Sequence, residues 1–138
     1  MSIDADERRS DTDAGRLPNI VIVDDDSALC ASIAGWIGTS CRTHCAAPSG
    51  AVPLLRGLSV VDVALVDCDA PPSIQAPVFQ ELGRWPSAIC ILMSANAQKV
   101  EQLRALGVFA PLVLDKPIHP EALEAIRSAT LELCRALA

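Results

Sequence analysis

Short apolar segments recur along the chain, and each stops at a polar residue, which is the feature that most constrains the fold. Residues 19–23 (NIVIV) are followed by three aspartates, residues 60–66 by Asp67, and residues 88–93 by Ser94. Short apolar runs of this kind are typical of strands that are buried on both faces. Such strands belong to parallel sheets covered by helices, so these three segments are predicted to form the centre of a parallel sheet.

Weaker strands and helices fill the intervals between these runs. Residues 41–46 alternate between two faces and are predicted to form an edge strand, and residues 112–114 a short fifth strand. Trp36 and Trp85 lie on apolar helix faces and are interpreted as core. Five strands alternating with five helices predict an α/β fold with helices on both faces of one parallel sheet. The predicted helices run from Ser27 to Gly38, over residues 49–58, from the end of a loop that contains Pro71, Pro72 and Pro77 to Pro86, from Ala97 to Gly107, and from Pro120 to the end.

Composition limits the chain to one domain outside the membrane. Its 138 residues, 51% of them apolar, suffice for one core and are too few for two ordinary domains. The longest uninterrupted apolar run, residues 88–93, is far shorter than the ~20 residues needed to cross a bilayer. A net charge of −6 with eleven Lys and Arg residues argues against nucleic acid as a direct partner.

The first 16 residues are rich in acidic side chains and lack the apolar segment of a secretory signal. We therefore expect a disordered acidic leader at residues 1–16, followed by one domain at residues 17–138. Without an export signal the chain is expected to be cytoplasmic and its six cysteines reduced. It ends directly after the last predicted helix with no effector sequence, so we expect it to act through a protein partner.

Polar side chains occupy the strand ends, which meet at one edge of a parallel sheet. Asp24 and Asp25 follow the first strand, Asp67 the third, Ser94 the fourth and Lys116 the fifth. Clustered carboxylates repel one another, and hard oxygen ligands suit Mg²⁺, which often works together with phosphate. The pattern predicts phosphoryl chemistry in which Asp67 attacks phosphorus. For Ser94, a helix-capping role is an alternative that could coexist with phosphate binding.

Four segments resemble motifs of the receiver domains of bacterial two-component response regulators, the CheY-like superfamily. They are VIVDDD at residues 21–26, VD at 66–67 with a proline four residues later, MSA at 93–95 and LDKP at 114–117. The resemblance covers about residues 18–138 and implies a flavodoxin-like (βα)₅ fold with strand order 2-1-3-4-5. It also implies a signalling switch, not an enzyme, that takes a phosphoryl group from a phosphohistidine. The implied partners are a sensor histidine kinase or phosphotransfer protein and a downstream protein, and the implied cofactor is Mg²⁺.

The resemblance assigns roles to individual residues of the predicted site. Asp67 would be the phosphoacceptor, Asp25 a direct Mg²⁺ ligand, and Asp24 a ligand through water. Lys116 would contact one phosphoryl oxygen, and Ser94 would hydrogen-bond another after phosphorylation and draw its loop inward. The other implied features are the backbone carbonyl of Asp69 as a Mg²⁺ ligand, Ala95 in the switch loop after Ser94, and a cis peptide bond between Lys116 and Pro117.

The sequence departs from the family pattern in three places. Val113 stands where the family usually has Tyr or Phe, so the usual aromatic switch is in doubt. The family's glycine after the phosphoacceptor is absent, with Gln75 and Ala76 in that region, and residues 107–116 are about two residues longer than usual. The choice of partner and a homodimer mode are therefore not carried over, and a homodimer stays open.

Two other functions compete with the switch. Residues 64–69 (ALVDCD) also resemble the first motif of haloacid-dehalogenase-like phosphatases, with Asp67 as nucleophile. That superfamily places its acidic pair after the nucleophile, whereas this chain places it before, and its length leaves no room for a cap domain. A pseudo-receiver that signals without phosphorylation is the second alternative.

Two further residues invite functional interpretations that the sequence pattern does not favour. His44 lies between Cys41 and Cys45, but strand alternation places it on the opposite face, which argues against a shared zinc site. Cys68, beside the phosphoacceptor, is interpreted as a packed thiol rather than an exposed redox thiol.

Overall fold

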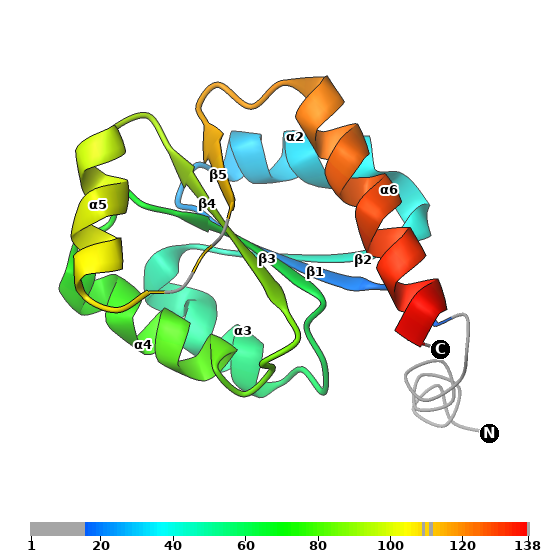
Figure 1. Cartoon of the computed structure of the whole chain (residues 1–138), viewed down its shortest axis with the longest axis horizontal. Helices are drawn as coiled ribbons and strands as arrows, with labels where there is room; N and C mark the ends of the chain where they lie inside the picture. Colours follow the sequence, from blue (N-terminus) through cyan, green and yellow to red (C-terminus); the bar gives the residue numbers. More distant parts are fainter. Residues whose placement is uncertain (1–15, 109, 111, 138) are drawn as a thin grey trace.

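The computed structural model describes residues 16–108, 110 and 112–137 and contains one five-stranded parallel sheet (Figure 1). The strand order is β2-β1-β3-β4-β5, so the predicted flavodoxin-like (βα)₅ topology is confirmed. The edge placement of the strand predicted at residues 41–46 is also confirmed. The strands are β1 (Asn19–Val23), β2 (Arg42–Ala46), β3 (Val63–Asp67), β4 (Ile89–Ser94) and β5 (Leu112–Asp115).

Helices cover both faces of the sheet. α2 and α6 lie on one face, and α3, α4 and α5 lie on the other (Figure 1). Two short 3₁₀ turns, η1 (Gly38–Ser40) and η2 (Pro48–Gly50), flank β2. The helices are α2 (Ser27–Ile37), α3 (Ala51–Arg56), α4 (Pro72–Leu82), α5 (Ala97–Ala105) and α6 (Pro120–Leu137). No helix in the described part of the chain is long and apolar enough to cross a membrane.

The two central strands supply side chains to both cores. Every residue of β1 and β3 is buried. In β1, Ile20 and Ile22 pack toward α2 and α6, whereas Val21 and Val23 pack toward α3, α4 and α5. This alternation follows from the two-residue period of a strand and explains why these segments are apolar at every inner position.

Capping residues begin the helices that follow β1 and β4. The Asp26 carboxylate accepts a hydrogen bond from the Leu29 backbone N–H at 3.0 Å and caps the start of α2. Asn96, rather than Ser94, caps α5, because its side-chain oxygen accepts from the Gln98 N–H at 2.9 Å. The capping alternative for Ser94 is therefore wrong.

Two predicted boundaries are corrected. β3 begins at Val63 rather than Val60, because the Asp62 carboxylate turns back to accept a hydrogen bond from the Asn19 N–H at 2.8 Å. α4 begins at Pro72 and includes Pro77, which we had expected in the preceding loop. Pro72 can start the helix because the first N–H groups of a helix have no partner within it.

Neither tryptophan is a fully buried core residue. Trp36 is 50% exposed, because α2 buries Cys30, Ile33 and Ile37 and the tryptophan lies outside that stripe. Trp85 lies beyond the end of α4, half-buried against the same core as that helix, and its indole N–H donates to the Ser59 carbonyl at 3.0 Å.

Residues 1–15 of the predicted leader lie outside the described residues. Arg16, the last residue of that predicted segment, is described, and its guanidinium donates to both oxygens of Asp62 at 2.7 and 2.8 Å. The chain is therefore tied to the start of the sheet one residue before the predicted domain boundary.

Candidate functional site

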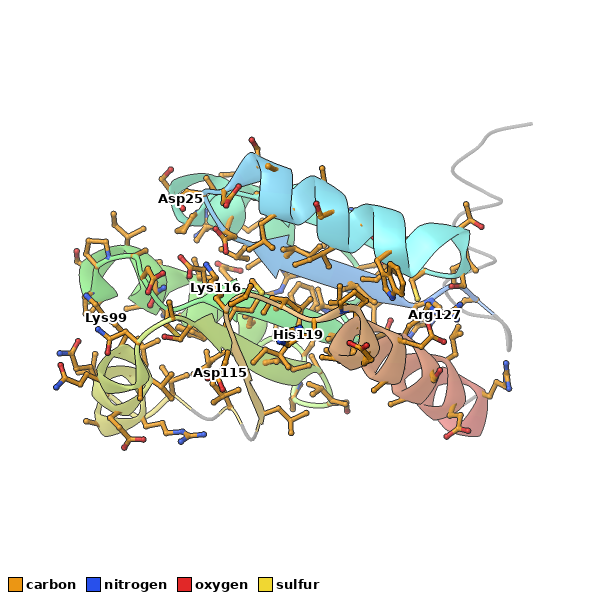
Figure 2. The ribbon with its side chains drawn as sticks, turned by 90° about the horizontal axis from the view of Figure 1, so that it is seen from above. Asp25, Lys99, Asp115, Lys116, His119 and Arg127 are labelled. Carbon is orange, nitrogen blue, oxygen red and sulfur yellow. The ribbon has the colours of Figure 1, made fainter. Side chains whose placement is uncertain are left out.

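The carboxyl ends of the strands bring the predicted site residues together at one edge of the sheet. β1 ends directly before Asp24, β3 ends on Asp67, and Lys116 follows β5. Carboxylate oxygens of Asp24, Asp25 and Asp67 all lie within 4.8 Å of one another. Figure 2 shows Asp25 and Lys116 toward the same end of the molecule, with Arg127 toward the other. The predicted convergence of an acidic cluster and a lysine is present in the structure.

One ammonium group bridges two buried carboxylates. The Lys116 Nζ donates to Asp24 Oδ2 and to Asp67 Oδ1, both at 2.8 Å, and lies 3.9 Å from Asp69 Oδ2. Asp24 and Asp67 are 3% and 2% exposed, whereas Asp25 is exposed. The cluster therefore has more negative than positive charge, and its solvent-facing carboxylate is Asp25.

The electrostatics of the cluster follow from this imbalance. Burial raises the pKa of Asp67, and the charges of Asp24 and Asp69 add to that rise, although the hydrogen bond from Lys116 opposes it. Burial alone would lower the pKa of Lys116, but its hydrogen bonds to Asp24 and Asp67 outweigh burial and raise it overall. A second cation would relieve the remaining repulsion between the carboxylates.

The donor set fits Mg²⁺. Three carboxylates within reach of one another, one of them open to solvent, offer hard oxygen ligands and leave room for the waters that Mg²⁺ keeps. Within the described residues, this trio is the group of histidines, cysteines and acids close enough to share a metal ion. His44 is instead in contact with Asn19, with 3.1 Å between its Nε2 and the amide oxygen.

Backbone hydrogen bonds hold the strand ends that carry the site. The Asp24 N–H donates to the Ala46 carbonyl at 3.0 Å, and the Asp24 Oδ1 accepts from the Asp26 N–H at 2.9 Å. The Lys116 N–H donates to the Ser94 carbonyl at 2.9 Å. The peptide bond between Lys116 and Pro117 is cis, as the resemblance implied.

The Ser94 hydroxyl is engaged within its own loop. Ser94 is buried, and its Oγ donates to the Asn96 carbonyl at 2.7 Å and accepts from the Asn96 N–H at 2.8 Å. Ala95 lies exposed between them. On β5, Val113 is half-buried against the core beneath α3, α4 and α5. The exposed Pro117 follows Lys116.

Gln75 is a residue of the site that the sequence analysis did not assign. It is completely buried at the start of α4, and its side-chain N–H donates to the backbone carbonyl of Asp67. Its amide oxygen is buried and has no hydrogen-bond partner among the described residues. The sequence signal at this position is the absence of the glycine that is usual in the family. The contact between the Gln75 side chain and the Asp67 carbonyl depends on packing and is visible only in the structure.

Cys68 is packed rather than exposed. Its side chain is buried, and burial raises the pKa of the thiol to about 11, with the charges of Asp67 and Asp69 adding to the rise. The interpretation of this thiol as a packed group is confirmed.

The topology is that of a flavodoxin-like α/β protein, and this one has an acidic cluster at the edge of its sheet. Solved structures with a similar fold include receiver domains. A CheY-like receiver domain from Methanospirillum hungatei matches with a TM-score of 0.68 and 20% identity, over 88% of this chain and 99% of that chain. The receiver domain of an HD domain-containing protein from Pseudomonas fluorescens matches with a TM-score of 0.68 and 21% identity, over 88% and 99%.

A third solved structure, described as adenylate cyclase from Rhodopirellula baltica, matches with a TM-score of 0.70 and 18% identity, over 88% and 92% of the two chains. No protein-family model matches the sequence, and no curated protein matches it significantly. The chain has the receiver-domain fold of two-component response regulators.

Proposed function

We propose that the chain is a phosphorylatable signalling switch that accepts a phosphoryl group on Asp67. One observation carries this proposal. A buried carboxylate at the end of β3 is held 2.8 Å from the ammonium of Lys116 and lies within 4.8 Å of two further carboxylates, in a receiver fold. The donor would be a phosphohistidine of a sensor histidine kinase or a phosphotransfer protein.

The groups at the edge of the sheet have complementary roles in such a transfer. The Asp67 carboxylate forms an oxygen–phosphorus bond as the nitrogen–phosphorus bond of phosphohistidine breaks, which leaves an aspartyl phosphate. The Lys116 ammonium neutralises charge on the transferring oxygens. Mg²⁺, held by Asp24, Asp25, Asp67 and the Asp69 carbonyl, would supply further positive charge for these oxygens when bound.

Switching would begin at the loop after β4. For the Ser94 hydroxyl to bind a phosphoryl oxygen, it must leave the Asn96 backbone groups that it now contacts. The loop that contains Ala95 would move with it. Because Val113 is aliphatic, the change would reach a partner surface without the aromatic rotamer typical of the family.

We propose that the downstream partner is a protein. Structures with the same fold come from an HD domain-containing protein and from a protein described as adenylate cyclase, so receiver folds serve different outputs. We place the chain in the cytoplasm, as a signalling protein rather than an enzyme.

The direct test is the intact mass of the full chain after incubation with acetyl phosphate, with and without Mg²⁺. We expect one Mg²⁺-dependent, hydroxylamine-labile phosphoryl adduct on the wild type and none on Asp67→Asn. Asp115→Asn is the matched control, because Asp115 is an exposed aspartate on β5 outside the acidic cluster, and it should keep the adduct. Asp25→Asn should weaken Mg²⁺ binding.

Three outcomes would contradict the proposal. An adduct that persists on Asp67→Asn would show that the acceptor is another residue. No adduct despite measured Mg²⁺ binding would favour a pseudo-receiver. Continuous hydrolysis of simple phosphate esters, lost in Asp67→Asn, would favour the phosphatase alternative.

A further inference from the structure

Two cysteines meet between the first helix and the edge strand of the sheet. Cys30 lies in α2, and Cys45 lies in β2, opposite Ile22 of β1. The Cys45 thiol donates to the Cys30 backbone carbonyl oxygen at 3.9 Å, so the two cysteines are in contact. Residues far apart in the sequence are thus brought together by α2 packing beside β2.

This pair combines a reachable sulfur with a covered one. Cys45 is exposed at the edge of the sheet, whereas Cys30 is 5% exposed. Both line a surface cavity of about 330 Å³ that Asp24 and Asp25 also line. A small polar oxidant in this cavity can reach Cys45 first and leaves Cys30 as the neighbouring thiol.

The other described cysteines do not combine these two properties. Cys41 and Cys68 are buried. Cys90 in β4 is half-buried, so neither Cys68 nor Cys90 is exposed to solvent as Cys45 is. Among the described residues, a contact between two cysteines and access from solvent therefore coincide at Cys30 and Cys45.

We propose that Cys30 and Cys45 form a reversible disulfide when the protein meets hydrogen peroxide. The Cys45 sulfur attacks one peroxide oxygen and breaks the O–O bond, which gives a sulfenic acid on Cys45 and one water. The Cys30 sulfur then displaces the sulfenic hydroxyl group, which forms the S–S bond and releases a second water. The two sulfurs are oxidised, the peroxide is reduced to two waters, and a small dithiol reverses the reaction.

The disulfide would alter a contact at the acidic edge. The Cys30 thiol now donates to the Asp24 backbone carbonyl at 3.6 Å, and a disulfide has no S–H to donate. The bond would also link α2 covalently to β2. Burial raises the pKa of Cys45, so little thiolate is present at neutral pH and the reaction should be slow. The proposal does not depend on phosphorylation of Asp67.

The test oxidises the reduced full chain with hydrogen peroxide, blocks the remaining thiols with iodoacetamide and maps the peptides by mass spectrometry. We expect a cross-linked peptide pair containing Cys30 and Cys45, lighter by two hydrogens and released by dithiothreitol. Cys45→Ser changes an exposed side chain, so the variant should fold and lack the cross-link. Cys90→Ala is the control and should retain it.

Other products would overturn the proposal. Conversion of Cys45 to sulfinic acid without a cross-link would show that Cys30 does not resolve the sulfenic acid. A disulfide between Cys68 and Cys90, or one between two chains, would place the reactive pair elsewhere. A cross-link that survives in Cys45→Ser would exclude this residue as a partner.

Discussion

Replacing the lysine of the acidic edge tests whether one cation holds the cluster together. Lys116→Met keeps the length of the side chain but removes the ammonium that contacts Asp24 and Asp67 at 2.8 Å. These two aspartate side chains are 1% and 3% exposed, so they would lose their positive partner in a site that water barely reaches. We expect the variant to be clearly less stable than the wild type.

The size of this loss follows from burial. Removing one partner of a buried ion pair typically costs about 3–5 kcal/mol. Because the Lys116 side chain is itself 19% exposed, we expect the lower end, about 3 kcal/mol. In a domain of this size that is a fall of roughly 10 °C in Tm. Acidification should reduce the loss, because protonation of the carboxylates removes the uncompensated charge.

Thermal and urea unfolding, with and without Mg²⁺, measure this effect. Mg²⁺ should restore more stability to Lys116→Met than to the wild type, because it supplies the missing positive charge. The control is Lys99→Met, which removes the only other lysine, a residue of α5 outside the acidic cluster (Figure 2). Equal losses in the two variants, or a Lys116→Met loss that does not shrink at acidic pH, would refute the electrostatic reasoning.

Three more predictions use chemical denaturation. Because the pKa of Asp67 is raised in the folded state, ionisation of this group opposes folding; Asp67→Asn should therefore stabilise the fold at pH 7, and the gain should vanish as pH falls below that pKa. Gln75→Leu should cost about 1–3 kcal/mol, because it leaves the buried Asp67 carbonyl without its donor, whereas Gln80→Leu on the exposed side of α4 should cost little. Leu65→Ala should cost about 2–5 kcal/mol and Trp36→Ala less than about 1 kcal/mol, so similar losses for these two would contradict their burial of 0% and 50%.

The strand order and the acidic edge are predictable because they depend on strong local signals. Apolar runs such as residues 19–23 need cover on both faces, and that requirement selects a parallel sheet with helices on either side. Once the strands are parallel, their polar terminal residues must share one edge. Asp24, Asp67 and Lys116 could therefore be placed together without knowledge of any contact.

Features that depend on packing were not predictable in this way. Trp36 satisfies helical spacing but lies just outside the stripe that α2 buries, a difference that a spacing rule does not resolve. Pro77 looks like a loop residue, yet it lies inside α4. Gln75 carries no signal for burial, and its contact with the Asp67 carbonyl exists only because α4 packs over the end of β3.

Lys116 directly follows β5. Among the strands whose ends form the site, β5 is the least buried. β1 and β3 are buried throughout, whereas β5 is an edge strand whose first and last residues are exposed. Local opening of a protein begins where backbone hydrogen bonds are most exposed to solvent. Amide hydrogens of β5 should therefore exchange sooner than those of β1 and β3. Each opening of β5 would move the Lys116 ammonium away from the aspartates, which would stay on the intact strands β1 and β3. The net charge of the site therefore depends on the dynamics of this edge strand.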